Sequence, residues 1–103
     1  MPATQIGTLA DIPDGTGRAF TVEGRRIAVF RAGDELFAID DTCSHGQASL
    51  SRGEFDPDEL CVECPLHGSL FDLRTGHPRT LPAFEPIATF RAFVDGDAVF
   101  VEY

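Results

Sequence analysis

Basic residues are scarce in this 103-residue chain. Eight Lys and Arg oppose seventeen Asp and Glu, which gives a formal net charge of −9. Nucleic acids and anionic membranes are bound through clustered basic side chains, so this scarcity argues against both as partners. The acidic surface instead suits protein partners with basic docking patches, and it also keeps a protein in solution.

Long apolar runs and targeting segments are missing as well. No stretch approaches the ~18 consecutive apolar residues that a membrane-spanning helix needs. The opening residues 1–6, Met-Pro-Ala-Thr-Gln-Ile, hold no basic stretch followed by an apolar run. Secretory signals and transit peptides have such features, so we expect neither and place the protein in the cytoplasm.

Cysteine is the third scarce residue, with three copies. An odd count in a chain without secretory features argues against a disulfide framework and favours metal ligands or reactive thiols. The length predicts one domain. A domain of this size buries only a modest core, which a bound metal centre would stabilise.

Short β-strands dominate what is present. Apolar runs are separated by turn-forming Gly and Asp, whereas we find no helix of three turns, no internal repeat and no low-complexity tract. We expect strands at 20–23, 26–31, 35–40, 60–63, 87–94 and 98–103, a further candidate at 6–12, and turns at Gly24-Arg25, Gly33-Asp34 and Asp95-Gly96-Asp97. The pattern predicts an all-β domain, an antiparallel sandwich or barrel.

The segment from about 41 to 86 differs from the rest of the chain. It is rich in Gly, Pro and Ser, and it contains all three histidines and all three cysteines. A loop-rich insertion of this length is usually functional. We therefore predict a single domain, 1–103, in which residues 1–40 and 87–103 form a β base and about 41–86 form an inserted subdomain that carries the site.

Two short motifs in the insertion pair a cysteine with a histidine. Cys43 and His45 form a C-x-H pair, and Cys64 and His67 form a C-x-x-H pair. A glycine follows each pair directly and permits the tight turn that aims two side chains at one centre. Thiolate and imidazole suit iron–sulfur, zinc or copper. Zinc sites usually group like ligands together, whereas mixed pairs let one iron take both cysteines and the other both histidines, so a zinc-binding interaction module is the alternative.

The sequence around the motifs resembles that of Rieske ferredoxins. Segments 43–53 (CSHGQASLSRG) and 64–76 (CPLHGSLFDLRTG) are similar to the two cluster loops of ferredoxin components of bacterial ring-hydroxylating dioxygenase systems. The likeness extends through Leu81-Pro82-Ala83 to the closing hairpin. It implies the Rieske fold, an antiparallel sandwich or barrel-like base with a cluster-binding subdomain at one tip. It also implies one [2Fe–2S] cluster per chain with four metal ligands: Cys43, His45, Cys64 and His67.

The same resemblance bears on the reduction potential. High-potential respiratory Rieske proteins have an extra cysteine in each loop, where this chain has Ala48 and Leu66. They also present a tyrosine hydroxyl to the cluster, where this chain has Phe71, and a serine hydroxyl, which Ser69 retains. Hydrogen bonds to cluster sulfur raise the potential, so we expect a value toward the low end of the roughly −150 to +300 mV Rieske range.

Other residues of the insertion have supporting or ordinary roles by this resemblance. Gly46 and Gly68 are expected to donate backbone N–H groups toward the cluster sulfurs, and Pro82 to shield the cluster. Cys61 belongs to no ligand pair and is expected to be a structural thiol. His77 matches no ligand and is expected on the surface. The acidic residues between the loops form either a docking rim or a solvated loop: Glu54, Asp56, Asp58 and Glu59.

The resemblance implies an electron carrier rather than an enzyme, and the chain offers no convincing catalytic base, nucleophile or open metal position. Such carriers are soluble monomers. Their partners are a flavin-dependent ferredoxin reductase and a terminal ring-hydroxylating oxygenase of aromatic hydrocarbon catabolism. Besides the zinc module, the alternatives are a small Rieske-like subunit of an assimilatory nitrite reductase and a redox sensor.

Overall fold

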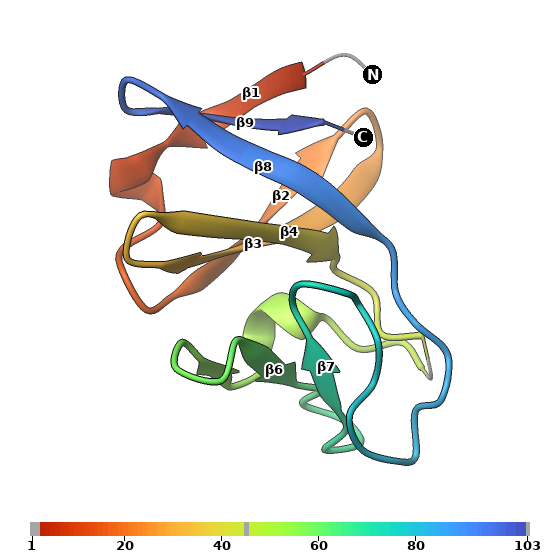
Figure 1. Cartoon of the computed structure of the whole chain (residues 1–103). Coiled ribbons are helices and arrows are strands. Elements are labelled where there is room, and N and C mark those ends of the chain that lie inside the picture. Colours follow the sequence, from red (N-terminus) through yellow and green to blue (C-terminus); the bar gives the residue numbers. More distant parts are fainter. Residues whose placement is uncertain (1–2, 45, 103) are drawn as a thin grey trace.

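The computed structural model describes residues 3–44 and 46–102, which form two antiparallel sheets (Figure 1). The larger sheet has the strand order β1-β9-β8-β4-β3-β2, and the smaller has the order β5-β6-β7. The larger sheet consists of β1 (Ala3–Thr8), β2 (Gly17–Val22), β3 (Arg25–Ala32), β4 (Glu35–Asp40), β8 (Thr89–Asp95) and β9 (Ala98–Glu102). The smaller consists of β5 (Phe55–Asp56), β6 (Cys61–Glu63) and β7 (Leu70–Asp72).

Helical structure in the described residues is limited to two short 3₁₀ helices, η1 (Leu9–Asp11) and η2 (Leu50–Arg52). Neither is long or apolar enough to cross a membrane, and the described part of the chain contains no other candidate.

The six-stranded sheet curls until its two edge strands approach each other. Thr4, Gln5 and Ile6 of β1 line one side of a shallow pocket, and residues 20–23, at the end of β2 and in the turn after it, line the other. The enclosed apolar core consists of Ile12, Val22, Ile27, Val29, Ala38, Val99 and Val101. The all-β class and the barrel-like antiparallel base predicted from the sequence are therefore confirmed.

Strand β3 of the larger sheet is covered on both faces, by the core of the base on one face and by the smaller sheet on the other. Its residues Ile27, Ala28, Val29 and Phe30 are all fully buried. Because side chains alternate along a strand, Ile27 and Val29 point into the base while Ala28 and Phe30 point toward the smaller sheet. The Phe30 ring packs on Phe55 of β5, with ring centroids 5.1 Å apart. Burial on both faces explains the continuous apolar run in the sequence.

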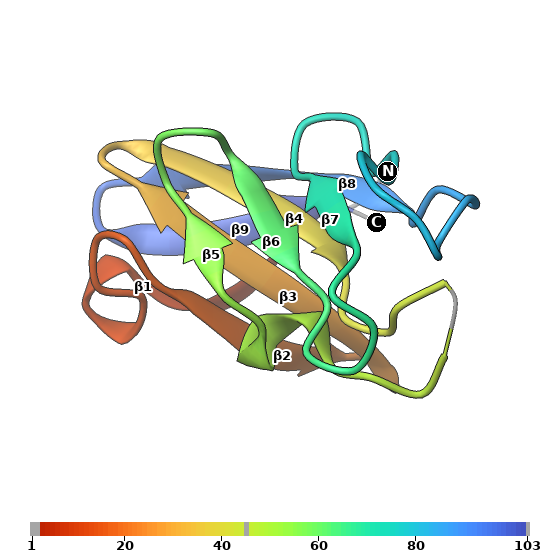
Figure 2. The ribbon, with the colours of Figure 1, turned by 90° about the horizontal axis from the view of Figure 1, so that it is seen from below.

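The three-stranded sheet lies against β3 and β4, as the view from below shows (Figure 2). A second apolar core joins it to the base. Its buried members are Ala28, Phe30, Ile39, Cys43, Ala48, Leu50, Val62, Cys64, Phe71, Leu73, Ala83 and Ile87. Two of the three cysteines belong to this core. Each loop that carries a paired motif is therefore anchored by its cysteine in the core between the two sheets.

The first hairpin turns one residue earlier than predicted. Strands β2 and β3 pair as far as Val22 and Arg25, so the turn residues are Glu23 and Gly24. These two have positive φ angles of 50° and 81°. Positive φ at both central residues is the geometry of a type I′ hairpin turn, which matches the twist of the strands and fixes the register.

Both bounds of the strand predicted at 6–12 are wrong. It begins at Ala3, where it pairs with β9, and it ends at Thr8. The Asp11 carboxylate accepts the Thr8 N–H at 2.9 Å and starts η1 in place of further strand.

Two other strands begin later than predicted. Leu60 has a φ of 53°, outside the strand region, so β6 starts at Cys61. Strand β8 starts at Thr89 because Ile87 donates its N–H to the Gly76 carbonyl at 2.9 Å instead of joining the ladder.

The two ends of the described chain lie side by side. Ala3 of β1 is the register partner of Glu102 of β9. Both strands lie on the side of the base away from the three-stranded sheet (Figure 1).

Candidate metal centre

The first paired motif lies on a loop that leaves β4 and folds back on itself. An isolated antiparallel bridge joins Thr42 to Ser49, and the Cys43 N–H donates to the Ala48 carbonyl at 3.0 Å. These contacts close the neck of the loop and bury Cys43, which is 3% exposed. His45, the second member of the motif, lies outside the described residues.

A buried carboxylate crosses the neck of this first loop. Asp41 is 1% exposed, and its Oδ1 accepts the Ser51 N–H at 2.8 Å. Its Oδ2 accepts the Ser49 hydroxyl at 2.5 Å and the Arg26 Nε–H at 3.2 Å. Burial raises the pKa of Asp41, but these hydrogen bonds outweigh burial and hold the pKa below its ordinary value. The carboxylate is therefore ionised at neutral pH.

The second paired motif lies on the loop between β6 and β7. The Gly68 N–H donates to the Cys64 carbonyl at 2.9 Å, and the Cys64 N–H donates to the Ser69 carbonyl at 2.8 Å. Gly68 has a φ of 77°, which glycine adopts without the steric cost of a side chain. The tight turn buries Cys64, which is 1% exposed.

The two loops meet where Gly46 faces His67. A Cβ atom on Gly46 would lie 2.7 Å from His67 Nε2 and 3.6 Å from Leu66 Cδ2. A glycine is therefore required at position 46 for the close approach of the two loops. The imidazole of the second motif thus lies against the residue that follows His45 in the chain.

A third loop, which precedes β8, joins the other two. The Ser69 hydroxyl accepts the Ala83 N–H at 3.0 Å. The Ser44 hydroxyl donates to the Glu85 carbonyl at 2.7 Å. Pro82 is exposed directly before Ala83, and its shielding role stays a prediction. Side-chain hydrogen bonds from both motif loops therefore hold the third loop in place.

The backbone N–H groups of Gly46 and Gly68 each form a hydrogen bond within their own loop. Gly46 donates to the Cys43 carbonyl at 3.4 Å, and Gly68 donates to the Cys64 carbonyl at 2.9 Å. Both glycines thereby shape the turns that carry the candidate ligands. The donation of their N–H groups to cluster sulfur stays a prediction.

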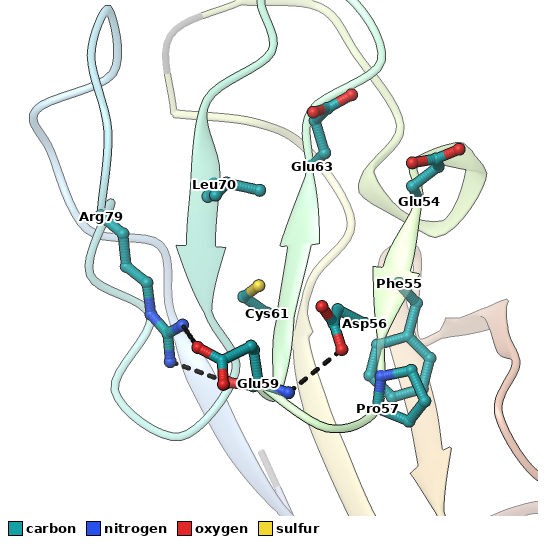
Figure 3. A pocket seen from close by; sticks show the side chains of 9 residues that line it. All are labelled: Glu54, Phe55, Asp56, Pro57, Glu59, Cys61, Glu63, Leu70 and Arg79. Carbon is teal, nitrogen blue, oxygen red and sulfur yellow. Dashed lines mark hydrogen bonds and ion pairs between the residues drawn. The ribbon is translucent and has the colours of Figure 1, made fainter.

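Cys61 lies apart from the paired motifs. It is 4% exposed and lines a groove on the outer face of the three-stranded sheet (Figure 3), whereas its neighbour Val62 points into the core. Burial raises the pKa of the Cys61 thiol, the Arg79 charge lowers it, and nearby carboxylates raise it further. Four carboxylates line the groove: Glu54, Asp56, Glu59 and Glu63. This environment suits the structural thiol that the sequence predicts.

The turn after β7 is built on Asp72. Its Oδ1 accepts the N–H groups of Arg74 and Thr75 at 2.8 and 3.2 Å, and its Oδ2 accepts Arg79 Nη2 at 2.8 Å. Burial raises the pKa of Asp72, but these hydrogen bonds and the Arg79 charge hold it below its ordinary value. His77 is exposed, as predicted, and contributes its carbonyl to the Asp72 N–H at 2.9 Å.

The donor set fits a centre with sulfur and nitrogen ligands. Cys43 and Cys64 belong to one buried core, and the His67 ring lies against the backbone of Gly46. Thiolate and imidazole together suit iron–sulfur chemistry. Across 3–44 and 46–102, no three His, Cys, Asp or Glu side chains form a group that could hold a single metal ion.

Comparisons with known proteins agree with this site. The family described as the Rieske [2Fe-2S] domain matches residues 3–91. The chain is 42% identical over 94 residues to the 3-phenylpropionate/cinnamic acid dioxygenase ferredoxin subunit of Escherichia coli (strain K12), covering 91% of this chain and 87% of that protein. The ferredoxin of carbazole 1,9a-dioxygenase from Nocardioides aromaticivorans IC177 superposes with a TM-score of 0.93 at 39% identity, covering 98% of this chain and 97% of the other.

A further match is a chain from a complex of reduced oxygenase and oxidized ferredoxin in carbazole 1,9a-dioxygenase. Its TM-score is 0.88 at 37% identity, covering 96% of this chain and 91% of that one. Fold, buried thiols and relatives together define a small β-sheet iron–sulfur protein. The chain belongs to the Rieske [2Fe-2S] domain family, and its cofactor is a [2Fe–2S] cluster. The Rieske fold expected from the resemblance is confirmed.

Proposed function

We propose that the chain is a one-electron carrier whose cluster is held by Cys43, His45, Cys64 and His67. The observation that carries this proposal is the approach of the His67 ring to Gly46, 2.7 Å from the position of a Cβ atom there. This approach brings the second motif against the first, while both cysteines are buried in one core. The cysteines would bind one iron and the histidines the other.

When bound, the cluster supplies a one-electron couple, and its two neutral imidazole ligands raise the potential above that of an all-thiolate cluster. Cys43 and Cys64, at 3% and 1% exposure, keep water from the sulfur side. His67 is only half-buried and leaves an imidazole edge near the surface for electron exit. Electron transfer needs no nucleophile, general base or open metal position, so the chain acts as a transfer component rather than as an enzyme.

An apolar tip next to the cluster loops supports the choice of partners. The strongly exposed large apolar residues of the described chain are Leu66, Leu81 and Phe84, at 61%, 79% and 72% exposure. They lie on the second and third loops, which the Ala83–Ser69 hydrogen bond joins, and exposed apolar residues on adjoining loops would form a docking surface. This tip would dock on a terminal ring-hydroxylating oxygenase, since oxygenase and ferredoxin form a complex in carbazole 1,9a-dioxygenase. A flavin-dependent ferredoxin reductase would supply the electrons.

The chain would work as a cytoplasmic monomer that forms one domain, 1–103. Residues 1–40 and 87–103 would act as a rigid base and about 41–86 as the cluster-binding part. The net charge of −9 supports transient docking on basic patches, because attraction of this kind raises association rates more than lasting affinity.

Reconstitution tests the proposal. The purified chain is mixed in air, which supplies O₂, with a candidate reductase, a terminal oxygenase, NADH and an aromatic substrate. The reductase takes two electrons from NADH, and the chain carries them singly to the oxygenase, so product forms only when the chain is present. Cys64→Ser, which removes one thiolate, is the matched control and gives no product. A colourless wild-type protein with stoichiometric zinc and no iron after anaerobic purification would contradict the proposal.

A further inference from the structure

The Asp41 carboxylate joins three parts of the chain at the base of the first cluster loop. Asp41 Oδ1 holds the Ser51 N–H on the returning arm of the loop, and Oδ2 holds the Ser49 hydroxyl on the same arm. Arg26 of β3 donates to Oδ2 as well. The carboxylate therefore ties the returning arm both to the outgoing arm and to the base.

Three backbone contacts cross the neck between the described residues of its two arms. They are the Leu50 N–H to the Asp41 carbonyl at 2.7 Å, the Cys43 N–H to the Ala48 carbonyl at 3.0 Å, and the Thr42–Ser49 bridge. The side chain of Asp41 adds three hydrogen bonds to these in a site that is almost closed to water. A buried acceptor of this kind is costly to leave unmatched, so the donors and the carboxylate fix one another's positions.

Asp41 and the two serines that it holds lie on either side of the proposed ligands in the first loop. Cys43 lies two residues after Asp41, and Gly46 of the same loop presses against His67 of the second loop. A small rotation of the first loop about its neck would move one ligand pair against the other. Both ligand pairs must meet the two irons at fixed bond lengths, so the centre is sensitive to such a rotation.

We propose that Asp41 is a positioning residue that sets the first ligand loop against the second and thereby the geometry of the cluster. This inference rests on the proposed function, because it takes Cys43 and His45 as ligands. Asp41 touches neither iron nor sulfur in this role. It acts through Ser49 and Ser51, and its influence falls on the loop rather than on global stability.

Substitutions at two of these positions test the role in the cluster-loaded protein. Asp41→Asn keeps the size of the side chain but replaces one acceptor oxygen with a donor. Ser49→Ala removes one hydrogen bond without a change of charge, and Ser49→Thr restores a hydroxyl. Asp72→Asn is the matched control, since Asp72 also holds two backbone N–H groups and an arginine, but in the turn after β7.

Two readouts separate positioning from stability. They are the EPR g values of the dithionite-reduced protein and the rate at which a chelator bleaches the visible spectrum, at a temperature where far-UV circular dichroism shows every variant folded. We expect Asp41→Asn to shift the g values and to bleach about 10-fold faster, as is typical of residues that support metal ligands. Ser49→Ala shifts both readouts in the same direction by less, Ser49→Thr restores them, and Asp72→Asn matches the wild type.

Wild-type g values and bleaching rates in both Asp41→Asn and Ser49→Ala would overturn the positioning role, as would equal changes in Asp72→Asn. If Asp41→Asn does not fold, the Ser49 pair decides alone. A wild-type protein without the Rieske EPR signal would instead overturn the proposed function, and the inference with it.

Discussion

At the scale of single residues, Cys61 and Cys64 differ in what they touch although they are three positions apart. Cys61 lines the outer groove, whereas Cys64 lies in the core with Cys43. We expect Cys61→Ser to keep the visible spectrum and the reduced-state EPR signal, and Cys64→Ser to lose both because it removes a proposed cluster ligand. Iron content and EPR of anaerobically purified variants check this. An iron-free Cys61→Ser protein that is still folded would contradict it.

The Phe71 side chain bears on the reduction potential. It is fully buried in the same core as Cys43 and Cys64, and it has no hydroxyl to donate. We expect a midpoint in the lower part of the Rieske range, and a value above about +150 mV would contradict this. Phe71→Tyr supplies a donor to cluster sulfur and should raise the midpoint. Protein-film voltammetry measures both, with Phe55→Tyr as a control hydroxyl beside the same core.

The close approach at Gly46 gives a steric prediction. In Gly46→Ala the new methyl group would lie 2.7 Å from His67 Nε2, so the imidazole must shift. We expect a lower iron content and altered EPR g values. Gly96→Ala in the β8–β9 turn is the control, because its added methyl meets nothing within 4 Å. An alanine at this positive φ costs about 1 kcal/mol of stability, and the substitution should leave the cluster unchanged. Full iron loading in Gly46→Ala would refute the steric argument.

The paired motifs could be predicted from the sequence because cysteine and histidine at such short spacing have few other uses. Asp41 and Ser44 could not, since an acid or serine at the end of a strand is typical of ordinary turns. The role of Ser44 depends on Glu85, 41 positions away in the chain. No local pattern carries that information.

At the scale of elements, the turn after β7 should make stability depend on pH. Because Asp72 has a pKa below its ordinary 3.8 in the folded state, its ionised form stabilises the fold. This contribution is complete above about pH 5 and is lost as the pH falls through the folded pKa. Asp72→Asn, which weakens the contact with Arg79, should lower the unfolding free energy by roughly 1.5 kcal/mol at pH 7.

Urea unfolding of the wild type and of Asp72→Asn at several pH values checks this prediction. The difference between the two should shrink below pH 3.8, the ordinary value for this group. A difference that stays constant to pH 2 or below, or that grows on acidification, would contradict the assigned direction.

Strand positions could be predicted well, and strand ends could not. Alternation and turn residues locate β4 at its exact bounds, because both ends are marked by local chemistry. The start of β8 depends on the Ile87 contact with Gly76, and the start of β6 on the left-handed conformation of Leu60. The partners of these two residues, Gly76 for Ile87 and Leu73 for the Leu60 carbonyl, lie more than ten positions away, which a reading of local pattern does not include.

At the scale of the whole molecule, the apolar tip and the acidic surface should contribute to docking in different ways. We expect Leu81→Ser and Phe84→Ser to raise the concentration of carrier needed for half-maximal oxygenase turnover, with unchanged EPR spectra. Electron delivery by the wild type should also slow as salt is added, because screening weakens long-range attraction to a basic partner. Steady-state assays at two ionic strengths measure both effects.

Ala10→Ser serves as the control for these docking variants, because Ala10 is exposed on η1 of the base. It should behave as the wild type. Equal losses in Ala10→Ser and Phe84→Ser would argue against a docking role of the tip.

The register that pairs Ala3 with Glu102 bears on how the molecule can be rewired. A linker of a few residues could connect these neighbouring strand ends, and the chain could be opened instead at the Gly96-Asp97 turn. Closely spaced ends of this kind tolerate circular permutation. Such a permuted chain would leave the cluster loops unchanged. Its new ends in the base could be attached to an electrode, so that every molecule presents its redox centre in the same orientation.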